Sequence, residues 1–385
     1  MFSRAKSIIF IVIALSGAVS NAEELKFGMT TALSGAAEAL GKGMQLGFDM
    51  YFQEINAKGG INGNTLTLIA KNDNYEPDNA ATNMRQLIND DKVLAIVGNV
   101  GTPTAIVTVP IANETKTLLY SAYTGANILR KTPPDRYVIN FRASYAEETT
   151  VIIDNLLAKG IKPEEIAFFT QNDSYGDAGF DGAVAALKKH GFNDSSKLGH
   201  GRYSRNTTNV EDALGSLLDL KIQPKAIIMV GAYAPCAKFI KLAKAEFPKT
   251  YFINVSFVGS DQLLALLGTD GEGVVITQVV PNHDANLPII KEYTDALQKY
   301  GKGAKPGFIS LEGYTAAKLL AEGLKNINGA VTKEAIIDAL ESIKNSDVGL
   351  GFNVTLDKID HQASHKIWPT IIKNGKFESL DWKDL

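Results

Sequence analysis

The sequence contains only one cysteine, Cys236, so no disulfide can form within the chain. Its formal net charge of −3 leaves no basic excess, which argues against binding to nucleic acid or to anionic lipid. No run of about 20 apolar residues is present, so we do not expect a membrane span. With 385 residues, 45% of them hydrophobic, the chain is long enough for two folded domains.

Motifs of common enzyme classes are missing too: there is no Walker loop, no H-E-x-x-H and no G-x-S-x-G. The glycines of 41–47 depart from the dinucleotide-binding spacing, and we interpret them as packing residues in a helix. His361 and His365 are four residues apart, but their segment resembles strand, turn and strand. We therefore interpret them as an exposed pair and not a zinc site. Cys236 is interpreted as a buried structural residue. We predict no enzyme, no cofactor and no metal.

The first 22 residues have the features of a secretory signal peptide. Arg4 and Lys6 form a basic start, a short apolar run follows, and Ser20 and Ala22 are small residues before a cleavage point. No cysteine lies at that point, so we expect no lipid anchor. The pattern predicts export to the periplasm of a Gram-negative bacterium.

Apolar runs that predict strands alternate with amphipathic segments that predict helices. The predicted strands are 25–33, 65–70, 93–98, 117–122, 137–141, 166–170, 197–203, 226–231, 252–259 and 273–280, before a β-rich tail. The predicted helices include 78–90, 146–159, 177–190, 209–220, 234–246, 287–300, 310–326 and 332–343. This alternation is typical of parallel sheets covered on both faces, here in two Rossmann-like blocks. Two such lobes form a cleft that can close over a ligand.

Two strand ends carry residues suited to a small anion. After the run "LAIVG", Thr102 is a good N-cap and Pro103 suits the first helical position. Free N–H groups at that helix start can bind a carboxylate, although an ordinary capped helix explains the pattern equally well. "LLYSAYTGA" places Thr124 just past another strand. If the two strands are neighbours, both hydroxyls face one point, without the lysine expected for a triphosphate.

Six segments together resemble, in order, the periplasmic solute-binding proteins for branched-chain amino acids, which are receptor subunits of ABC importers. The segments are 33–74, 96–105, 119–130, 172–179, 230–235 and 258–264. The resemblance implies a type I periplasmic binding fold with three hinge crossovers. It places lobe I at 23–142 plus 281–349, and lobe II at 143–280 plus 350–385.

The resemblance also implies roles for residues of the first lobe and for one acid. Thr102 matches a carboxylate-binding residue, and Thr124 matches a threonine that binds both ends of an amino acid. Ala122 matches a residue whose carbonyl accepts from the ligand ammonium. Asp261 stands where the family often has an acid for that ammonium, although helix capping is the alternative for this residue.

Aromatic residues and two departures from the family complete the predicted site. Tyr175 and Tyr233 match second-lobe residues that close on the ligand. Leu40 stands where some amino-acid binders have a bulky aromatic, and Tyr123 replaces a small residue. Weaker candidates for the cleft lining are Tyr145, Phe308 and Ile309.

The sequence therefore predicts a monomeric binding protein that captures a small carboxylate, first of all a branched-chain or other apolar amino acid. It would deliver this solute to an inner-membrane ABC permease after hinge closure. The alternatives are a binder of an aromatic or other non-amino carboxylate or amide, and a periplasmic ligand sensor. An enzyme on the same scaffold is disfavoured, because no histidine falls near the predicted cleft residues.

Overall fold

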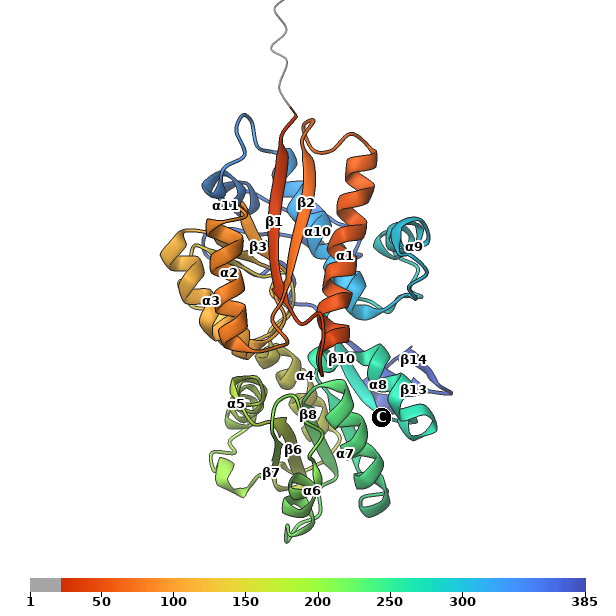
Figure 1. Cartoon of the computed structure of the whole chain (residues 1–385). Coiled ribbons are helices and arrows are strands. Elements are labelled where there is room, and N and C mark those ends of the chain that lie inside the picture. Colours follow the sequence, from red (N-terminus) through yellow and green to blue (C-terminus); the bar gives the residue numbers. More distant parts are fainter. Residues whose placement is uncertain (1–21) are drawn as a thin grey trace, which may run out of the picture.

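The computed structural model describes residues 22–385, which form the two lobes seen one above the other in Figure 1. The predicted signal peptide lies outside the described residues except for its last position, Ala22. Each lobe is a β-sheet with helices packed against it. The predicted α/β class with two Rossmann-like lobes is therefore confirmed.

Lobe I contains a five-stranded sheet in the order β2-β1-β3-β4-β5, with every pair parallel. Its strands are β1 (Glu24–Thr31), β2 (Thr65–Asn72), β3 (Ala95–Val97), β4 (Leu118–Tyr120) and β5 (Val138–Ile139). Its helices are α1 (Glu38–Ala57), α2 (Pro77–Asn89), α3 (Thr102–Thr115), α9 (Pro288–Tyr300), α10 (Phe308–Lys325) and α11 (Lys333–Glu341). Helix α1 packs on α10, and α2 packs on α3.

The glycines of 41–47 allow α1 to pack closely on its surroundings. A Cβ on Gly47 would lie 2.4 Å from the carbonyl oxygen of Ser310 in α10. A Cβ on Gly41 would lie 1.9 Å from the carbonyl oxygen of Ala32. Because any larger residue would separate these elements, the interpretation of these glycines as packing residues is confirmed.

Lobe II contains a seven-stranded sheet in the order β14-β13-β10-β9-β8-β6-β7. The strands are β6 (Ile166–Gln171), β7 (Gly199–Tyr203), β8 (Ala226–Val230), β9 (Tyr251–Asn254), β10 (Val275–Gln278), β13 (Trp368–Lys373) and β14 (Lys376–Ser379). The helices are α4 (Tyr145–Ala158), α5 (Ser174–Lys189), α6 (Glu211–Leu218), α7 (Tyr233–Glu246) and α8 (Ser260–Leu267). Strands β13 and β14 pair antiparallel, so the β-rich tail extends an otherwise parallel sheet. A short ribbon joins β11 (Ser346–Asp347) and β12 (Asn353–Val354).

The predicted strand at 252–259 is wrong in its second half. Strand β9 ends at Asn254, and a 3-10 turn over Ser256–Val258 leads into α8. Gly259, with a φ of 83°, permits the left-handed turn that precedes the helix. The second half of this segment is apolar because Phe257 is fully buried between the lobes. Phe257 does not belong to a strand.

Three segments connect the lobes, between β5 and α4, between β10 and α9, and between β12 and β13. The first and third run side by side, because Asn140 N donates to His361 O at 2.7 Å and Ala363 N donates to Asn140 O at 3.0 Å. The interpretation of His361 as exposed is wrong. Its ring is buried at this hinge, with nitrogens 2.8 Å from Val138 O and 3.1 Å from Glu341. The exact lobe boundaries stay predictions.

His365 forms a second hinge contact, with Glu147 in the first turn of α4. The His365 Nδ1 atom lies 2.6 Å from the Glu147 carboxylate, and Nε2 lies 3.0 Å from Asp360. The bond to Glu147 raises the pKa of His365 from 6.5 to about 9. Although burial opposes its ionisation, bonds from His365 and Ser144 lower the pKa of Glu147 to about 2.

We expect this hinge pair to make stability depend on pH. The contribution of His365 is complete below its unfolded pKa of 6.5 and is lost as the pH rises towards 9. That of Glu147 is present above 4.5 and is lost only as the pH falls towards 2. Urea unfolding of the native protein and His365→Gln should therefore differ most between pH 5 and 6.5, and converge by pH 10. A difference that stays constant over this range would contradict the assignment.

Candidate functional site between the lobes

Thr102 and Thr124 lie side by side at the carboxyl edge of the lobe I sheet. Strands β3 and β4 pair in parallel, so the loops that follow them meet at this edge. The two hydroxyl oxygens are 2.7 Å apart, and both side chains are buried. The structure thus brings these two predicted site residues to one point, which we call the threonine pair.

The start of α3 differs from the sequence prediction. Gly101, with a φ of 104°, takes the N-cap position, and Thr102 and Pro103 are the first two helical residues. The prediction of Thr102 as the N-cap is wrong, because this backbone conformation favours glycine. The Thr102 hydroxyl bonds Thr124 and does not cap the helix. The N–H groups of the first turn have no acceptor within the helix, and the helix dipole adds partial positive charge. A carboxylate is well matched to this position.

Ala122 and Tyr123 lie in the loop between β4 and Thr124. The Ala122 carbonyl accepts from Thr124 N at 2.8 Å, which leaves it one further lone pair. Tyr123 is buried, and its hydroxyl donates to Ser256 O of lobe II at 3.2 Å. Tyr123 therefore joins the lobes directly, which a small residue at this position could not do.

Five buried aromatic side chains, which we call the aromatic cluster, lie between the lobes: Tyr75, Tyr123, Tyr145, Tyr175 and Phe257. The centre of the Phe257 ring is 4.4 Å from that of Tyr175, 5.3 Å from Tyr123 and 6.2 Å from Tyr75. The Tyr145 ring lies 5.4 Å from that of Tyr175. Tyr175 thus lies between the lobes, and its contact with a ligand stays a prediction.

Two members of the aromatic cluster touch the loops that carry the threonine pair. A Cβ on Gly101 would lie 2.1 Å from Cε2 of Tyr75, so this ring lies directly on the start of α3. Tyr145 N donates to Gly125 O at 2.8 Å. The Tyr145 hydroxyl is buried facing Thr124 and forms no hydrogen bond of normal length with any of residues 22–385. It can therefore act as a third hydroxyl donor at the threonine pair.

A fully buried arginine connects both lobes behind Tyr123. The Arg142 Nε lies 3.5 Å from Glu312 of α10, and a terminal nitrogen donates to Ser256 Oγ of lobe II. The guanidinium carbon lies 4.5 Å from the centre of the Tyr123 ring. Ser256 in turn donates its N–H and hydroxyl to Glu148, each at 2.8 Å. Burial raises the pKa of Glu312 to about 7, although Arg142 acts against this rise.

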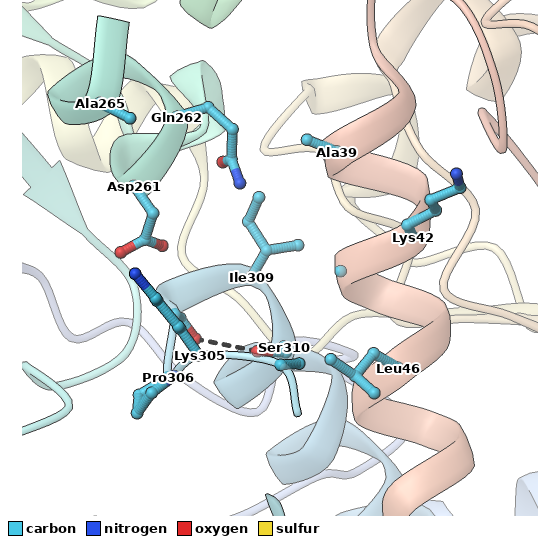
Figure 2. A pocket seen from close by; sticks show the side chains of 13 residues that line it. Ala39, Lys42, Leu46, Asp261, Gln262, Ala265, Lys305, Pro306, Ile309 and Ser310 are labelled. Atoms are coloured by element: carbon cyan, nitrogen blue, oxygen red, sulfur yellow. Dashed lines mark hydrogen bonds between the residues drawn. The ribbon is translucent and has the colours of Figure 1, made fainter. Parts of the chain in front are cut away.

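Asp261 lies in a separate pocket of about 430 Å³ between α1, α8 and residues 304–310. Figure 2 shows the lining side chains Asp261, Gln262, Ala265, Ala39, Lys42, Leu46, Lys305, Pro306, Ile309 and Ser310. The Asp261 carboxylate accepts from Phe308 N at 3.0 Å, at the first residue of α10, and burial raises its pKa. In the described part of the chain, no hydrogen bond joins Asp261 to the threonine pair. Asp261 therefore caps α10, which belongs to the other lobe, and does not cap its own helix α8.

Leu40 and Tyr233 meet at Gly259. A Cβ on Gly259 would lie 2.8 Å from Leu40 Cδ2 and 3.0 Å from Tyr233 Cδ1. Leu40 is fully buried and Tyr233 is half-buried. Leu40 of lobe I and Tyr233 of lobe II therefore both pack against the backbone of Gly259. Their contact with a ligand stays a prediction.

Tyr75 and Phe257 are the two members of the aromatic cluster that sequence analysis missed, and it also missed Arg142 and the ion pair of Arg205 with Glu76. Tyr75 has a φ of 61°, a conformation rare for a bulky residue, and no sequence pattern indicates it. Phe257 lies in an apolar run that resembles a strand, so the sequence does not indicate its position between the lobes.

Residues 22–385 hold no group of three His, Cys, Asp or Glu side chains that could bind a metal ion. None of the helices in that range is long and apolar enough to cross a membrane. Cys236 is fully buried, and burial raises the pKa of its thiol, as suits the structural role predicted for it.

An ion pair joins the lobes at another point of the cleft. Arg205 of lobe II lies 2.8 Å from Glu76 of lobe I and 3.0 Å from Asp173 of lobe II. The neighbouring Asn206 donates to Glu76 at 2.7 Å. A second contact between the lobes runs from Gln171 to the Tyr75 hydroxyl, at 3.3 Å. We call the Arg205 and Asn206 contacts with Glu76 the rim contact.

We expect Arg205→Met to weaken ligand affinity modestly, because closure would no longer form the rim contact. A partly exposed ion pair contributes about 0.2–1 kcal/mol, so affinity should fall by a factor of about 1.4 to 5. The difference should shrink between 50 and 300 mM salt because of screening. Titration calorimetry tests this. Arg85→Met, which removes the 2.8 Å pair with Glu114 inside lobe I, is the control and should leave affinity unchanged.

Comparison with known proteins gives one consistent family. The chain matches the family model described as periplasmic binding protein over residues 24–376. The Leu/Ile/Val-binding protein homolog 7 of Brucella melitensis is 26% identical over 378 residues, which cover 91% of this chain and 90% of the relative. Homologues in this comparison are thus binding proteins and not enzymes.

Solved structures agree with the family match. A possible leucine/isoleucine/valine-binding protein from Rhodopirellula baltica is 50% identical, with a TM-score of 0.92, covering 94% of this chain and 98% of that one. A branched-chain amino acid ABC transporter protein from Thermus thermophilus with bound valine shares the fold at 17% identity, with a TM-score of 0.82 and coverages of 94% and 96%. On these similarities, the chain belongs to the periplasmic binding protein family.

Proposed function

We propose that this protein captures a small carboxylate-bearing solute between its lobes in the periplasm and delivers it to an inner-membrane ABC permease. The observation that carries the proposal is the threonine pair, with hydroxyl oxygens 2.7 Å apart at the N-terminus of α3. Hydroxyl groups and free helix N–H groups at one point can donate several charge-assisted hydrogen bonds to one carboxylate.

The contacts between the lobes support closure as the capture mechanism. Tyr123 bonds Ser256 O beside the threonine pair, and Arg205 bonds Glu76 at another point, so residues of both lobes meet at two places in the cleft. A ligand that bridges the lobes favours the closed form only if it binds that form more tightly than the open one. A carboxylate held by lobe I and covered by Tyr175 of lobe II meets this condition.

The names of the relatives make a branched-chain amino acid the first class of solute to test. The decisive experiment is a thermal-shift screen of the chain without residues 1–22 against amino acids and small aromatic and aliphatic acids. A ligand at 100 times its Kd stabilises the folded state by about 2.7 kcal/mol, which raises the melting temperature measurably. If neutral analogues stabilise the protein and no carboxylate does, the proposal is wrong.

A periplasmic sensor remains the second candidate, because the same cleft could report a ligand to a membrane receptor. Deleting the gene in its own organism separates the two. Loss of uptake of the radiolabelled ligand supports transport, whereas unchanged uptake with a lost response to the ligand supports sensing.

A further inference from the structure

One arginine that does not contact the threonine hydroxyls supports the loop on which Thr124 lies. Arg130 follows this loop in lobe I, and its side chain is partly buried. Its Nη1 donates to the carbonyl oxygen of Thr124 at 3.3 Å and to that of Ala126 at 3.1 Å. We call residues 122–126 the Thr124 loop. The guanidinium of Arg130 therefore holds the backbone that carries the Thr124 hydroxyl.

The same guanidinium reaches two of the three segments that connect the lobes. Its Nη2 donates to Arg142 O in the first segment at 2.8 Å, and its Nε donates to Gln362 Oε1 in the third at 2.6 Å. Arg130 thus uses four of its five N–H groups, each for a different acceptor. Because a guanidinium is planar and rigid, it keeps all four bonds only while the acceptors hold one arrangement.

Two further contacts extend this connection into lobe II. Gln362 Nε2 donates at 2.9 Å to Glu147 in the first turn of α4. Tyr145 N, at the first residue of α4, donates to Gly125 O at 2.8 Å. A Cβ on Gly125 would lie 2.5 Å from Tyr145 N, so α4 begins directly on the Thr124 loop. The three consecutive carbonyls of 124–126 therefore accept from Arg130 or from lobe II.

Closure of the cleft changes the geometry around Arg130. When two lobes close, they rotate about the segments that connect them. Arg142 and Gln362 lie on two of these segments, whereas Thr124 lies in lobe I. Rotation therefore changes the distances between the Thr124 loop and the other acceptors of Arg130, and the rigid guanidinium has to release some of its bonds. The Thr124 loop has its full set of backbone supports only in one position of the hinge.

From these contacts we infer that Arg130 is a positioning residue that couples the Thr124 loop to the hinge. The binding conformation of the loop and the closed position of the hinge then stabilise each other, because energetic coupling is reciprocal. The inference rests on the proposed binding of a solute at Thr124 and adds how binding there is transmitted to the connecting segments. Arg130 acts through backbone carbonyls and Gln362 and not through contact with the solute.

A double-mutant cycle tests the coupling without any ligand. Gln362→Leu removes the hinge acceptor of Arg130, and Arg130→Lys keeps the charge but replaces the planar group by a single nitrogen. Mass spectrometry would follow hydrogen exchange of residues 119–129 in the native protein, both single variants and the double variant. Each single change should speed exchange of this segment about threefold or more, and the double variant should exchange no faster than Arg130→Lys.

The cycle separates coupling from simple support of the loop. If Arg130 only supported the Thr124 loop, Gln362→Leu would leave exchange of residues 119–129 unchanged, and this result would overturn the inference. Effects that multiply in the double variant would also overturn it, because they would show that hinge and loop respond independently.

A second measurement relates the coupling to binding. In small-angle X-ray scattering, saturating leucine should lower the radius of gyration of the native protein and of Arg85→Lys, which makes the same change at the Arg85–Glu114 pair inside lobe I. Arg130→Lys should bind leucine about tenfold more weakly and stay more open at saturation. Full closure of Arg130→Lys would overturn the inference. If leucine does not bind the native protein, leucine is the wrong solute for the proposed function, and the exchange cycle alone decides the role of Arg130.

Discussion

Replacing both Thr102 and Thr124 by alanine is expected to abolish the ligand-induced rise in melting temperature while leaving the unliganded protein folded. Each charge-assisted hydrogen bond to a carboxylate contributes roughly 1.5–3 kcal/mol, so loss of two should weaken affinity roughly 100-fold or more. The hydroxyls bond mainly each other in the closed lobes, 2.7 Å apart, so their joint removal leaves no charged group unpaired. Thermal shift and calorimetry with the ligand from the screen measure both quantities.

The same helix offers a matched control. Thr115 is the last residue of α3, and its hydroxyl lies 3.1 Å from that of Thr117 just beyond the helix, which also accepts from Lys333 Nζ at 2.6 Å. Thr115→Ala with Thr117→Ala makes the same chemical change away from the cleft and should leave affinity at the native value. Equal losses of affinity in both double variants would show that the effect acts through the stability of α3 and not through ligand contact.

The second large effect concerns stability and not binding. Arg142→Met is expected to destabilise the protein by about 3–5 kcal/mol, because it leaves Glu312 and Glu148 buried without their counter-charge. The loss should be smaller at pH 5.5 than at pH 8. Burial raises the folded pKa of Glu312 from 4.5 to about 7, so this carboxyl is mostly protonated at the lower pH. Urea unfolding at the two pH values measures the difference.

Two further variants identify the cause of that loss. Glu312→Gln in the Arg142→Met background should recover part of the stability at pH 8, because it removes one buried charge. Arg85→Met is the control: Arg85 pairs with Glu114 at 2.8 Å, and the two side chains are 47% and 61% exposed. Its removal should change stability little, because water screens an exposed ion pair. An equal effect of both arginines would contradict the account of the buried network.

Much of the fold follows from local sequence, because buried parallel strands and amphipathic helices leave clear patterns. The threonine pair was also predictable, since β3 and β4 are neighbours and both loops leave the same sheet edge. The exception in the fold, residues 252–259, shows the limit of the method. An apolar run indicates burial, and Phe257 of lobe II is buried against rings of both lobes and not within a sheet.

The rest of the site depends on contacts between residues far apart in the chain. Asp261 has the residue type and position expected for an ammonium partner, yet its carboxylate accepts from Phe308 N, 47 residues away. Tyr75 reaches the start of α3 through a left-handed backbone that no spacing rule indicates. Arg142 and Glu312 lie far apart in the chain and come together only in the folded protein. Sequence therefore predicts where a carboxylate can be held more readily than what surrounds it.

The most direct test of carboxylate binding at the threonine pair compares a carboxylate with its neutral amide. Benzoate and benzamide, and leucine and leucinamide, differ only in the group that would meet Thr102, Thr124 and the start of α3. The account predicts that, for whichever acid binds, calorimetry finds the acid at least tenfold tighter than its amide, and that Thr102→Ala with Thr124→Ala removes this preference. Equal affinity of acid and amide in the native protein would contradict it.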